Sequence, residues 1–180
     1  MQSIHTRELT AAALFCALTA ICSQISLPLP FTPVPINLAA FAVLAAAGLL
    51  GCRGAVLSVA AYLLLGAAGV PVFAGFRGGL SVLAGPTGGY LAGYLAAAWI
   101  TGWLLKAPGK KAFATVLAMV AGLAACYLLG TVWFLMLTGS GLAAALGSCV
   151  VPFLPGDAVK IAAAAFLTQK LQRKARHLSI

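Results

Sequence analysis

The chain has 180 residues, of which 63% are hydrophobic and only 7% are charged, and its mean hydropathy is +1.08. Soluble domains carry about 25% charged residues, so a chain with so few ionic groups cannot cover a core in water. The composition excludes an ordinary soluble domain and predicts a protein whose surface mostly faces lipid.

In lipid, every backbone polar group must be satisfied within the protein, so only helices and closed barrels span a membrane. Apolar runs such as 9–27 and 113–137 are much longer than the about 10 residues of alternating polarity that a barrel strand needs. We therefore predict an all-α integral membrane bundle of six transmembrane helices that forms a single transmembrane domain over residues 1–180.

The net charge of +9 would suit nucleic acid. However, the basic residues lie at the ends of apolar segments rather than on one polar face, so we expect membrane lipid and no nucleic acid as a partner. The five cysteines show no CxxC spacing and are expected to be small buried hydrophobes. We predict no metal and no cofactor.

The first predicted helix covers residues 7–25, and its apolar stretch is longer than that of a signal peptide, so we expect it to be retained. Four prolines in 28–35 end it, because proline lacks an amide donor and clashes with the preceding turn. A second helix over 36–50, a tight turn over 51–54 and a third helix over 55–68 follow.

The segment 69–90 contains seven glycines and two prolines. Such density favours irregular backbone, which is tolerated at membrane depth only where it is buried in protein or lines a cavity. The fourth helix is predicted over 87–105, a polar link over 106–111, and the fifth helix over 112–137.

A break is predicted at 138–141, followed by a short helical or re-entrant piece over 143–151. Proline is favoured at the first helical position, so Pro155 is a good start for the sixth helix, which we expect over 155–171.

Lysine and arginine stay on the cytoplasmic side during insertion. With six helices and both termini inside, the inner segments hold nine of the eleven basic residues and the outer segments hold one, Arg77. Lys160 lies within the sixth helix. We therefore predict a multi-pass protein of the cell inner (cytoplasmic) membrane with both termini in the cytoplasm. The nine inner residues are Arg7, Arg53, Lys106, Lys110, Lys111, Lys170, Arg173, Lys174 and Arg176.

Two ionisable residues, Asp157 and Lys160, lie three positions apart in the predicted sixth helix, which places both side chains on one helix face. A charge deep in a membrane span costs about 2.5–3.5 kcal/mol on insertion scales, and such residues usually face a cavity or a pathway. The alternative is a self-neutralising pair that only tolerates its position. We favour a polar anchor in a substrate cavity.

Arg77 is either a solvated loop arginine or an attraction point for an anionic substrate. The two glycines after it would let the backbone fold over a ligand. The outer loops also carry aromatic residues that are singly typical of core packing and together would enclose an apolar ring. These aromatic residues are Phe31, Phe73, Phe76, Tyr90 and Phe153.

Ala13 and Ala17 form a small-xxx-small pair in the first helix, a spacing that lets helices approach closely. The pair serves either packing within the protein or docking of a partner membrane subunit. Sequence motifs for ATP hydrolysis, zinc proteases and serine hydrolases are missing, and both histidines lie near the termini. Acid–base chemistry would have to use Asp157 and Lys160 almost alone, so we do not predict an enzyme.

Four segments in this order resemble the BioY family of biotin transporter subunits, and the resemblance covers nearly the whole chain. The resemblance implies the six-helix substrate-binding subunit of an energy-coupling-factor transporter. Such a subunit pairs with a transmembrane coupling subunit and two cytoplasmic ATPases. It could also act without these partners, alone or as a homo-oligomer. The alanine pair of the first helix would dock the coupling subunit. The four segments are Pro28-Leu-Pro-Phe-Thr-Pro-Val-Pro35, Gly66-Ala-Ala-Gly-Val-Pro-Val-Phe-Ala-Gly75, Gly85-Pro-Thr-Gly-Gly-Tyr90 and Pro152-Phe-Leu-Pro-Gly-Asp-Ala-Val-Lys160.

If biotin is the substrate, Asp157 would accept from the urea N–H groups, and Lys160 would donate to the urea carbonyl or to the valerate. Arg77 would meet the valerate at the mouth. The chain departs from the family where it reads Pro35-Ile-Asn-Leu-Ala39 in place of Pro-Ile-Thr-Leu-Gln, so Asn37 stands where the family has threonine. The predicted substrate-binding residues are Asp157, Lys160, Arg77, Phe31, Phe73, Thr87, Tyr90 and Asn37.

Two alternatives stay open at this point. One is a transporter subunit for another small vitamin or heterocycle. The other is a small membrane assembly factor or enzyme.

Overall fold

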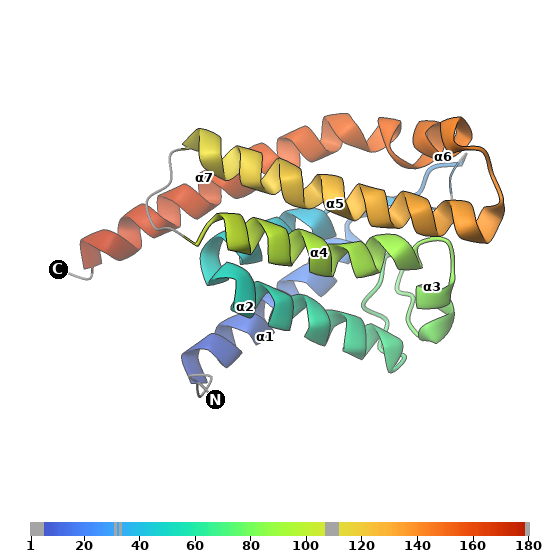
Figure 1. Cartoon of the computed structure of the whole chain (residues 1–180). Coiled ribbons are helices and arrows are strands. Elements are labelled where there is room, and N and C mark those ends of the chain that lie inside the picture. The colour runs from blue at the N-terminus through green and yellow to red at the C-terminus, as the bar shows by residue number, and fades with distance from the viewer. Residues whose placement is uncertain (1–5, 31, 33, 107–111, 179–180) are drawn as a thin grey trace.

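The computed structural model describes residues 6–30, 32, 34–106 and 112–178, with side chains up to residue 174 (Figure 1). The described chain is mostly helical, which agrees with the predicted all-α class. Its elements in chain order are α1 (Thr6–Gln24), β1 (Ser26–Leu27), β2 (Ile36–Asn37), α2 (Ala39–Ala67), α3 (Leu80–Ala84), α4 (Gly88–Leu104), α5 (Ala112–Thr138), α6 (Leu142–Cys149), the 3-10 turn η1 (Val151–Phe153) and α7 (Leu154–Leu178).

Four of the described helical stretches are long and apolar enough to cross a membrane, namely α1, α2, α5 and the stretch 142–174 that includes α7. The 17 residues of α4 run beside α5 (Figure 1). A helix of that length spans about 26 Å at about 1.5 Å per residue, close to the hydrocarbon thickness. Since α2 is two helices joined at a kink, the bundle has the six helical segments that the sequence predicts.

The kink in α2 lies at Gly51, whose φ of 71° and ψ of −174° are not helical. Glycine suits this position because it lacks the Cβ that makes positive φ unfavourable. The two halves of α2 run in opposite directions from this point (Figure 1). Gly102 of α4 packs against the backbone of the turn, where a Cβ would come 2.5 Å from the Cα of Cys52. The chain reversal therefore falls within the predicted turn at 51–54, but it is confined to Gly51, and residues 52–54 are already helical.

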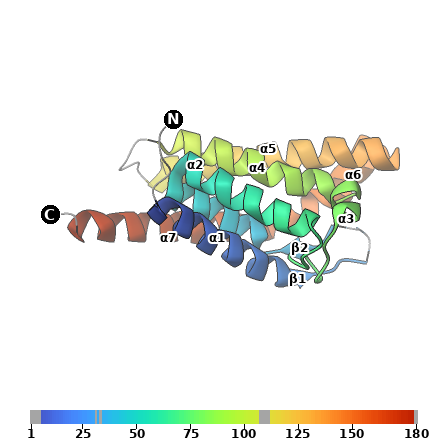
Figure 2. The ribbon, with the colours of Figure 1, turned by 90° about the horizontal axis from the view of Figure 1, so that it is seen from below.

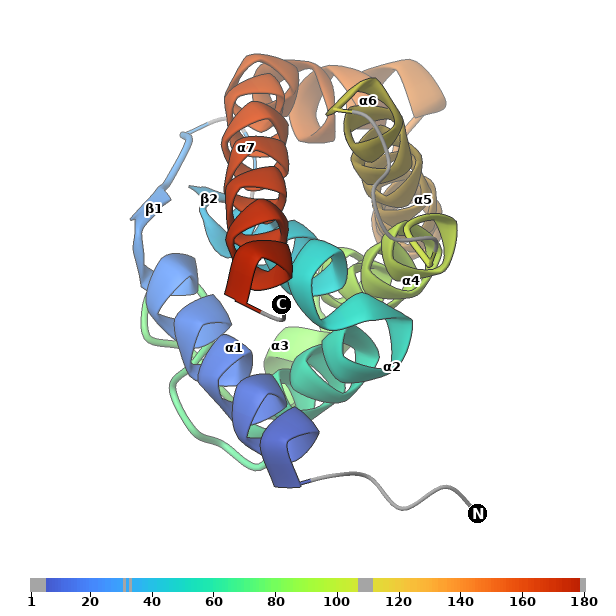
Figure 3. The same ribbon diagram turned by 90° about the vertical axis from the view of Figure 1, so that its left-hand side faces the viewer.

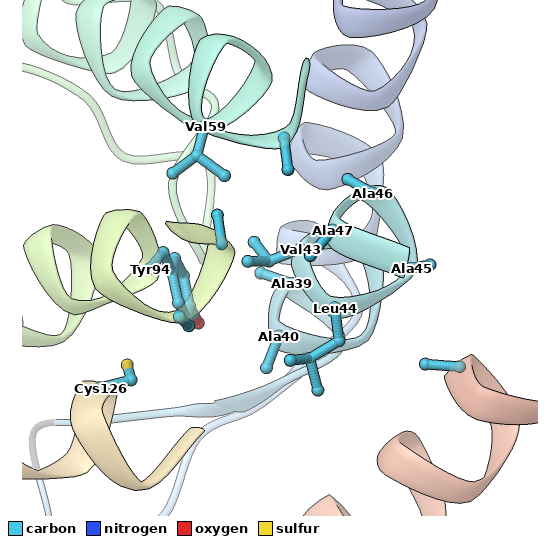
Figure 4. Close-up of a cluster of buried hydrophobic side chains, with 14 of the residues drawn as sticks. Ala39, Ala40, Val43, Leu44, Ala45, Ala46, Ala47, Val59, Tyr94 and Cys126 are labelled. Atoms are coloured by element: carbon cyan, nitrogen blue, oxygen red, sulfur yellow. The ribbon is translucent and has the colours of Figure 1, made fainter. Parts of the chain in front are cut away.

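The core lies where α2 packs against its neighbours. Figure 3 shows α1 beside the second half of α2, with α4, α5 and α7 completing the bundle. The facing side chains are small: Ala39, Ala45 and Ala98 have no exposed surface, and Figure 4 shows the alanines of α2 in the space opposite Val59 and Tyr94. Lipid gives no hydrophobic driving force for helix association, so close packing holds the helices together, and small residues let their backbones approach closely.

One end of the bundle carries the short elements β1, β2, α3 and α6 (Figure 2). The strands pair antiparallel, with Ser26 opposite Asn37. The predicted helical start at Ile36 is therefore wrong. The amide oxygen Oδ1 of Asn37 accepts from the N–H of Ala39 at 3.1 Å, a local turn that delays the helix to Ala39.

The other differences from the predicted elements are small. The glycine-rich segment contains the single short helix α3, and α6 with η1 provides the predicted short helical piece before the last span. The last helix continues to Leu178 rather than 171, because its polar final turns need no apolar surroundings. Prediction and structure agree closely for α4 and α5.

Apart from Arg77, the described basic residues outside the membrane core gather at the end of the bundle opposite α3 and α6. Arg7 is in the first turn of α1, Arg53 follows the kink of α2, Lys106 follows α4, and Lys170 and Arg173 lie near the end of α7. The beginning of α1 and the end of α7 lie at this same end (Figure 3). This distribution fits the predicted orientation with the basic end in the cytoplasm.

Candidate ligand cavity

A cavity lies at the end of the bundle that holds α3 and α6, between the outer turns of α4, α5 and α7 and the two chain segments that follow α1 and α2. Its empty space is about 720 Å³ when the open solvent at its mouth is included. The side chains that line it are mostly apolar or aromatic. The residues at its wall are Ser23, Val34, Pro35, Asn37, Ala40, Phe73, Ala74, Arg77, Val82, Thr87, Tyr90, Leu91, Tyr94, Leu123, Cys126, Tyr127, Cys149, Phe153, Asp157 and Lys160.

Asp157 and Lys160 form the charged part of this wall. The Lys160 ammonium lies 2.7 Å from Oδ1 of Asp157, and both residues are buried, at 7% and 5% exposure respectively. Asp157 is in the first turn of α7, where the helix dipole favours its negative charge. The predicted pairing on one helix face is confirmed, and both side chains face the cavity rather than lipid.

Tyr127 of α5 completes the group by donating its hydroxyl to Oδ2 of Asp157. The carboxylate thus receives one hydrogen bond from its own helix and one from the neighbouring helix. Burying a pair of charges is rarely favourable for stability, because desolvation offsets the attraction. A buried pair beside an open cavity is better explained by a polar ligand than by fold stability.

A second polar group lies on another wall. The hydroxyl of Tyr94 on α4 donates to Oδ1 of Asn37 at 3.3 Å, and this same oxygen accepts from the backbone of Ala39. Among the described residues, the Asn37 amide nitrogen donates to no protein group. Asn37 itself is part of the cavity wall.

Tyr90 and Thr87 come from the start of α4. The Tyr90 hydroxyl and Thr131 Oγ1 lie 3.3 Å apart. Tyr90 also belongs to a small apolar cluster at the mouth with Val34, Cys149 and Phe153. This cluster joins the proline segment before α2 to the proline segment before α7, so both proline motifs border the same cavity.

Phe73 and Arg77 come from the glycine-rich segment. Their backbones pair with each other at 2.9 and 3.2 Å, and the ring of Phe73 is 2% exposed against Tyr62. Gly66 of α2 leaves room for this ring, since a Cβ there would overlap it. Arg77 is exposed, and its Nε donates to the carbonyl of Ala74 at 3.3 Å. Its position marks the mouth of the cavity.

The structure therefore brings seven of the eight predicted binding residues to one cavity, namely Asn37, Phe73, Arg77, Thr87, Tyr90, Asp157 and Lys160. Phe31 lies outside the described residues. Of the other aromatic candidates, Phe153 lines the cavity, whereas Phe76 is 73% exposed and does not.

Sequence reasoning missed Tyr94 and Tyr127. Both lie within apolar helices, where a phenol needs a hydrogen-bond partner when it is buried. That requirement was the available signal. It does not say which partner a tyrosine finds, because the partner comes from a distant segment in each case: Asn37 of β2 for Tyr94 and Asp157 of α7 for Tyr127.

The exposed face of α1 lies away from the cavity. Ala13 and Ala17 are both exposed, with Leu14 and Ile21 beside them at 66% and 62% exposure. Phe15 and Cys16 form the buried face of the same helix. The alanine pair therefore does not serve packing within the described chain, and the alternative of an external contact remains.

The sequence is similar to known proteins over nearly its whole length. The model of the BioY family matches residues 1–177. Similar curated proteins include the biotin transporter BioY of Thermotoga maritima, 43% identical over 93% of this chain and 96% of that protein. The probable biotin transporter BioY of Pyrococcus horikoshii is 40% identical over 94% of this chain and 98% of that protein.

The fold is also similar to a crystal structure of the S-component for biotin from an ECF-type ABC transporter. The TM-score is 0.88, the sequence identity is 28%, and each chain is covered to 95%. Together with the family match over residues 1–177, these similarities establish that the chain belongs to the BioY family.

Proposed function

We propose that the chain binds biotin at the outer face of the cell membrane and is the substrate-binding subunit, or S-component, of an ECF-type biotin transporter. Relatives that it matches over nearly their whole length are named biotin transporters or probable biotin transporters. The observation that carries the proposal is the buried pair Asp157–Lys160 in the wall of an aromatic-lined cavity.

The chemistry of biotin suits this wall. Its cyclic urea offers two N–H donors and one carbonyl acceptor. The Asp157 carboxylate accepts from the N–H groups, since each carboxylate oxygen has a further lone pair beyond its bond to Lys160 or Tyr127. Hydrogen bonds to a charged group are stronger than those between neutral groups. They therefore compensate better for the hydrogen bonds to water that biotin loses on binding.

The apolar thiophane ring then lies against Phe73 and Tyr90, and the amide N–H groups of Asn37 serve the urea carbonyl or the valerate. Thr87 offers a further hydroxyl. The valerate points to the mouth, where the Arg77 guanidinium meets its carboxylate. A site with a few converging polar groups in an apolar wall is the usual form of a specific small-molecule pocket.

The proposed role as an S-component also implies protein partners. An S-component works with a transmembrane coupling subunit and two ATPase subunits, and the exposed Ala13–Ala17 face of α1 is the docking surface that we propose for the coupling subunit. The chain itself serves as one transmembrane substrate-binding domain and not as an enzyme.

Equilibrium binding of labelled biotin to the detergent-purified chain tests the proposal. We expect a sub-micromolar Kd and displacement by unlabelled biotin, with no displacement by thiamine or riboflavin at the same concentration. Displacement by either of these vitamins would assign the cavity to a different heterocycle. Absence of biotin binding by folded protein would refute the proposal.

A further inference from the structure

Gln24, the last residue of α1, contacts the glycine-rich segment through both ends of its side-chain amide. Its Nε2 donates to the carbonyls of Pro71 and Phe73 at 3.3 and 3.1 Å. Its Oε1 accepts from the backbone N–H of Phe76 at 2.9 Å. One side chain therefore satisfies three backbone groups of a segment about 50 residues away.

The segment from Gly69 to Gly79, here called the mouth loop, needs such support. Phe76 has a φ of 56°, a conformation that is unfavourable for a bulky residue, and its ring is 73% exposed, so packing does not hold it there. The base of the loop is tied by the bond from Gly79 N–H to the Gly66 carbonyl at 2.7 Å. Between the base and the tip, the Phe73 ring packs against Tyr62 of α2, and Gln24 supplies the side-chain hydrogen bonds from another element to the loop backbone.

The mouth loop carries Phe73 and Arg77, which line the cavity. Their placement depends on the backbone that Gln24 holds, since the Phe73 carbonyl and the Phe76 N–H are two of its three partners. Gln24 itself is not part of the cavity wall. It is therefore a positioning residue that acts through the loop.

We propose that Gln24 holds the mouth loop in its position at the cavity wall and makes that position depend on the position of α1. The helix is continuous from the exposed Ala13–Ala17 face to Gln24, so a displacement of α1 by a docked subunit moves all three hydrogen bonds together. Loss of these bonds leaves the loop in an unfavourable backbone conformation, and the loop then leaves this position. This inference rests on the proposed binding function of the cavity.

The first test measures the loop without ligand. Amide hydrogen exchange is followed by mass spectrometry in the purified full chain and in Gln24→Met, which keeps the length of the side chain but makes none of the three bonds. We expect exchange in 70–79 to rise at least tenfold, since a net hydrogen bond is worth roughly a factor of two to ten and the variant loses three, with exchange in α4 and α5 unchanged. Gln172→Ala is the matched control, because Gln172 donates at 2.8 Å to the Gly48 carbonyl at the other end of the bundle.

The second test measures biotin kinetics in the same proteins. Loss of the Gln24 contacts should raise the dissociation rate about tenfold and change the association rate less than twofold, which a general loss of folding would not do. Gln24→Glu keeps the acceptor but loses both donors, and serves as a second variant if Gln24→Met does not fold. It should also raise exchange in the loop.

Unchanged exchange in 70–79, or a rise spread equally over α1, α2 and the loop, would overturn the inference. If wild-type protein does not bind biotin, the proposed function fails, while the exchange experiment still decides whether Gln24 holds the loop. Asp157→Asn separates the two further: it should reduce biotin binding and leave exchange of the free mouth loop unchanged.

Discussion

The hydroxyl of Tyr127 on α5 donates to the carboxylate of Asp157 on α7, which joins two helices at the polar end of the cavity. Because Lys160 occupies the other carboxylate oxygen, the orientation of the carboxylate is fixed from both sides before any ligand binds. A preorganised acceptor loses less freedom on binding, which increases affinity.

Tyr127→Phe removes this hydrogen bond and keeps the ring. A hydrogen bond to a charged group contributes about 1.5–3 kcal/mol, so we expect biotin affinity to fall roughly tenfold or more in titration calorimetry. Tyr62→Phe is the matched control, since Tyr62 donates to Ser23 outside the charged group. An equal loss of affinity in both variants would assign the effect to packing rather than to Asp157.

Asp157→Asn should weaken biotin binding at least a hundredfold while the protein still folds, because the neutral amide loses its charge and one of its two acceptor oxygens. It should also lower the unfolding temperature, since Lys160 is left as an unpaired buried charge. Glu8→Gln neutralises the other acidic residue, which is exposed on α1, and should change neither quantity. Wild-type affinity in Asp157→Asn would remove this residue from the site.

The double variant Asp157→Asn with Lys160→Met separates the stability effect from the binding effect. Lys160→Met removes the buried charge that Asp157→Asn leaves unpaired, and an unpaired buried charge is the main cost of breaking such a pair. We therefore expect an unfolding temperature above that of the single variant and no recovery of affinity. Recovered affinity would show that the charges are not needed for binding.

Arg77→Gln tests the mouth of the cavity with two ligands. Wild-type protein should bind biotin several-fold more tightly than biotin methyl ester, and the difference should shrink with added salt, since Arg77 is exposed and its charge is screened. In Arg77→Gln the two ligands should bind alike. Lys106→Gln, at the opposite end of the bundle, is the control, and a preference for biotin that survives in Arg77→Gln would place the carboxylate elsewhere.

Gly66→Ala introduces a Cβ that would overlap the ring of Phe73. Overpacking of this kind costs about 1–3 kcal/mol, so the unfolding temperature and the biotin affinity should both fall. Gly147→Ala in α6 is matched in chemistry but meets no atom within 4 Å, and should be neutral in thermal unfolding. A neutral Gly66→Ala would mean that Phe73 has another position available.

Ala17→Trp places a large ring on the exposed face of α1. We expect the purified variant to bind biotin like wild type but to lose co-purification with the coupling subunit and ATPases of its own genome, because tight helix approach needs small residues. Leu128→Trp, on the exposed side of α5, should leave assembly intact. Assembly of Ala17→Trp at wild-type levels would move the docking surface elsewhere.

Much of the fold could be predicted because it depends on local properties of the chain. Long apolar runs and proline clusters define α5 and the ends of α1, and the glycine pattern locates the reversal at Gly51. The start of α2 could not be predicted, because it depends on the pairing of residue 37 with Ser26, which is a contact between separate segments.

The site also contains residues that could be predicted from the sequence and residues that could not. Asp157 and Lys160 could be found because charges are rare and costly in a membrane helix. The roles of Tyr127 and Tyr94 could not be predicted, since a tyrosine in an apolar helix gives no indication of which segment lies opposite. Gln24 could not be identified either, because its three partners are backbone atoms and any residue supplies those.

The packed alanines beneath the cavity have a consequence for transport. The wall ends at Ala40 on α2 and Lys160 on α7, and inward of these positions Ala47, Ala98 and Met119 have no exposed surface. Within the described chain these buried residues close the inner end of the cavity, so under the proposed function biotin would leave by the opening through which it entered. Delivery to the cytoplasm would then require the whole subunit to reorient in the bilayer together with its ligand.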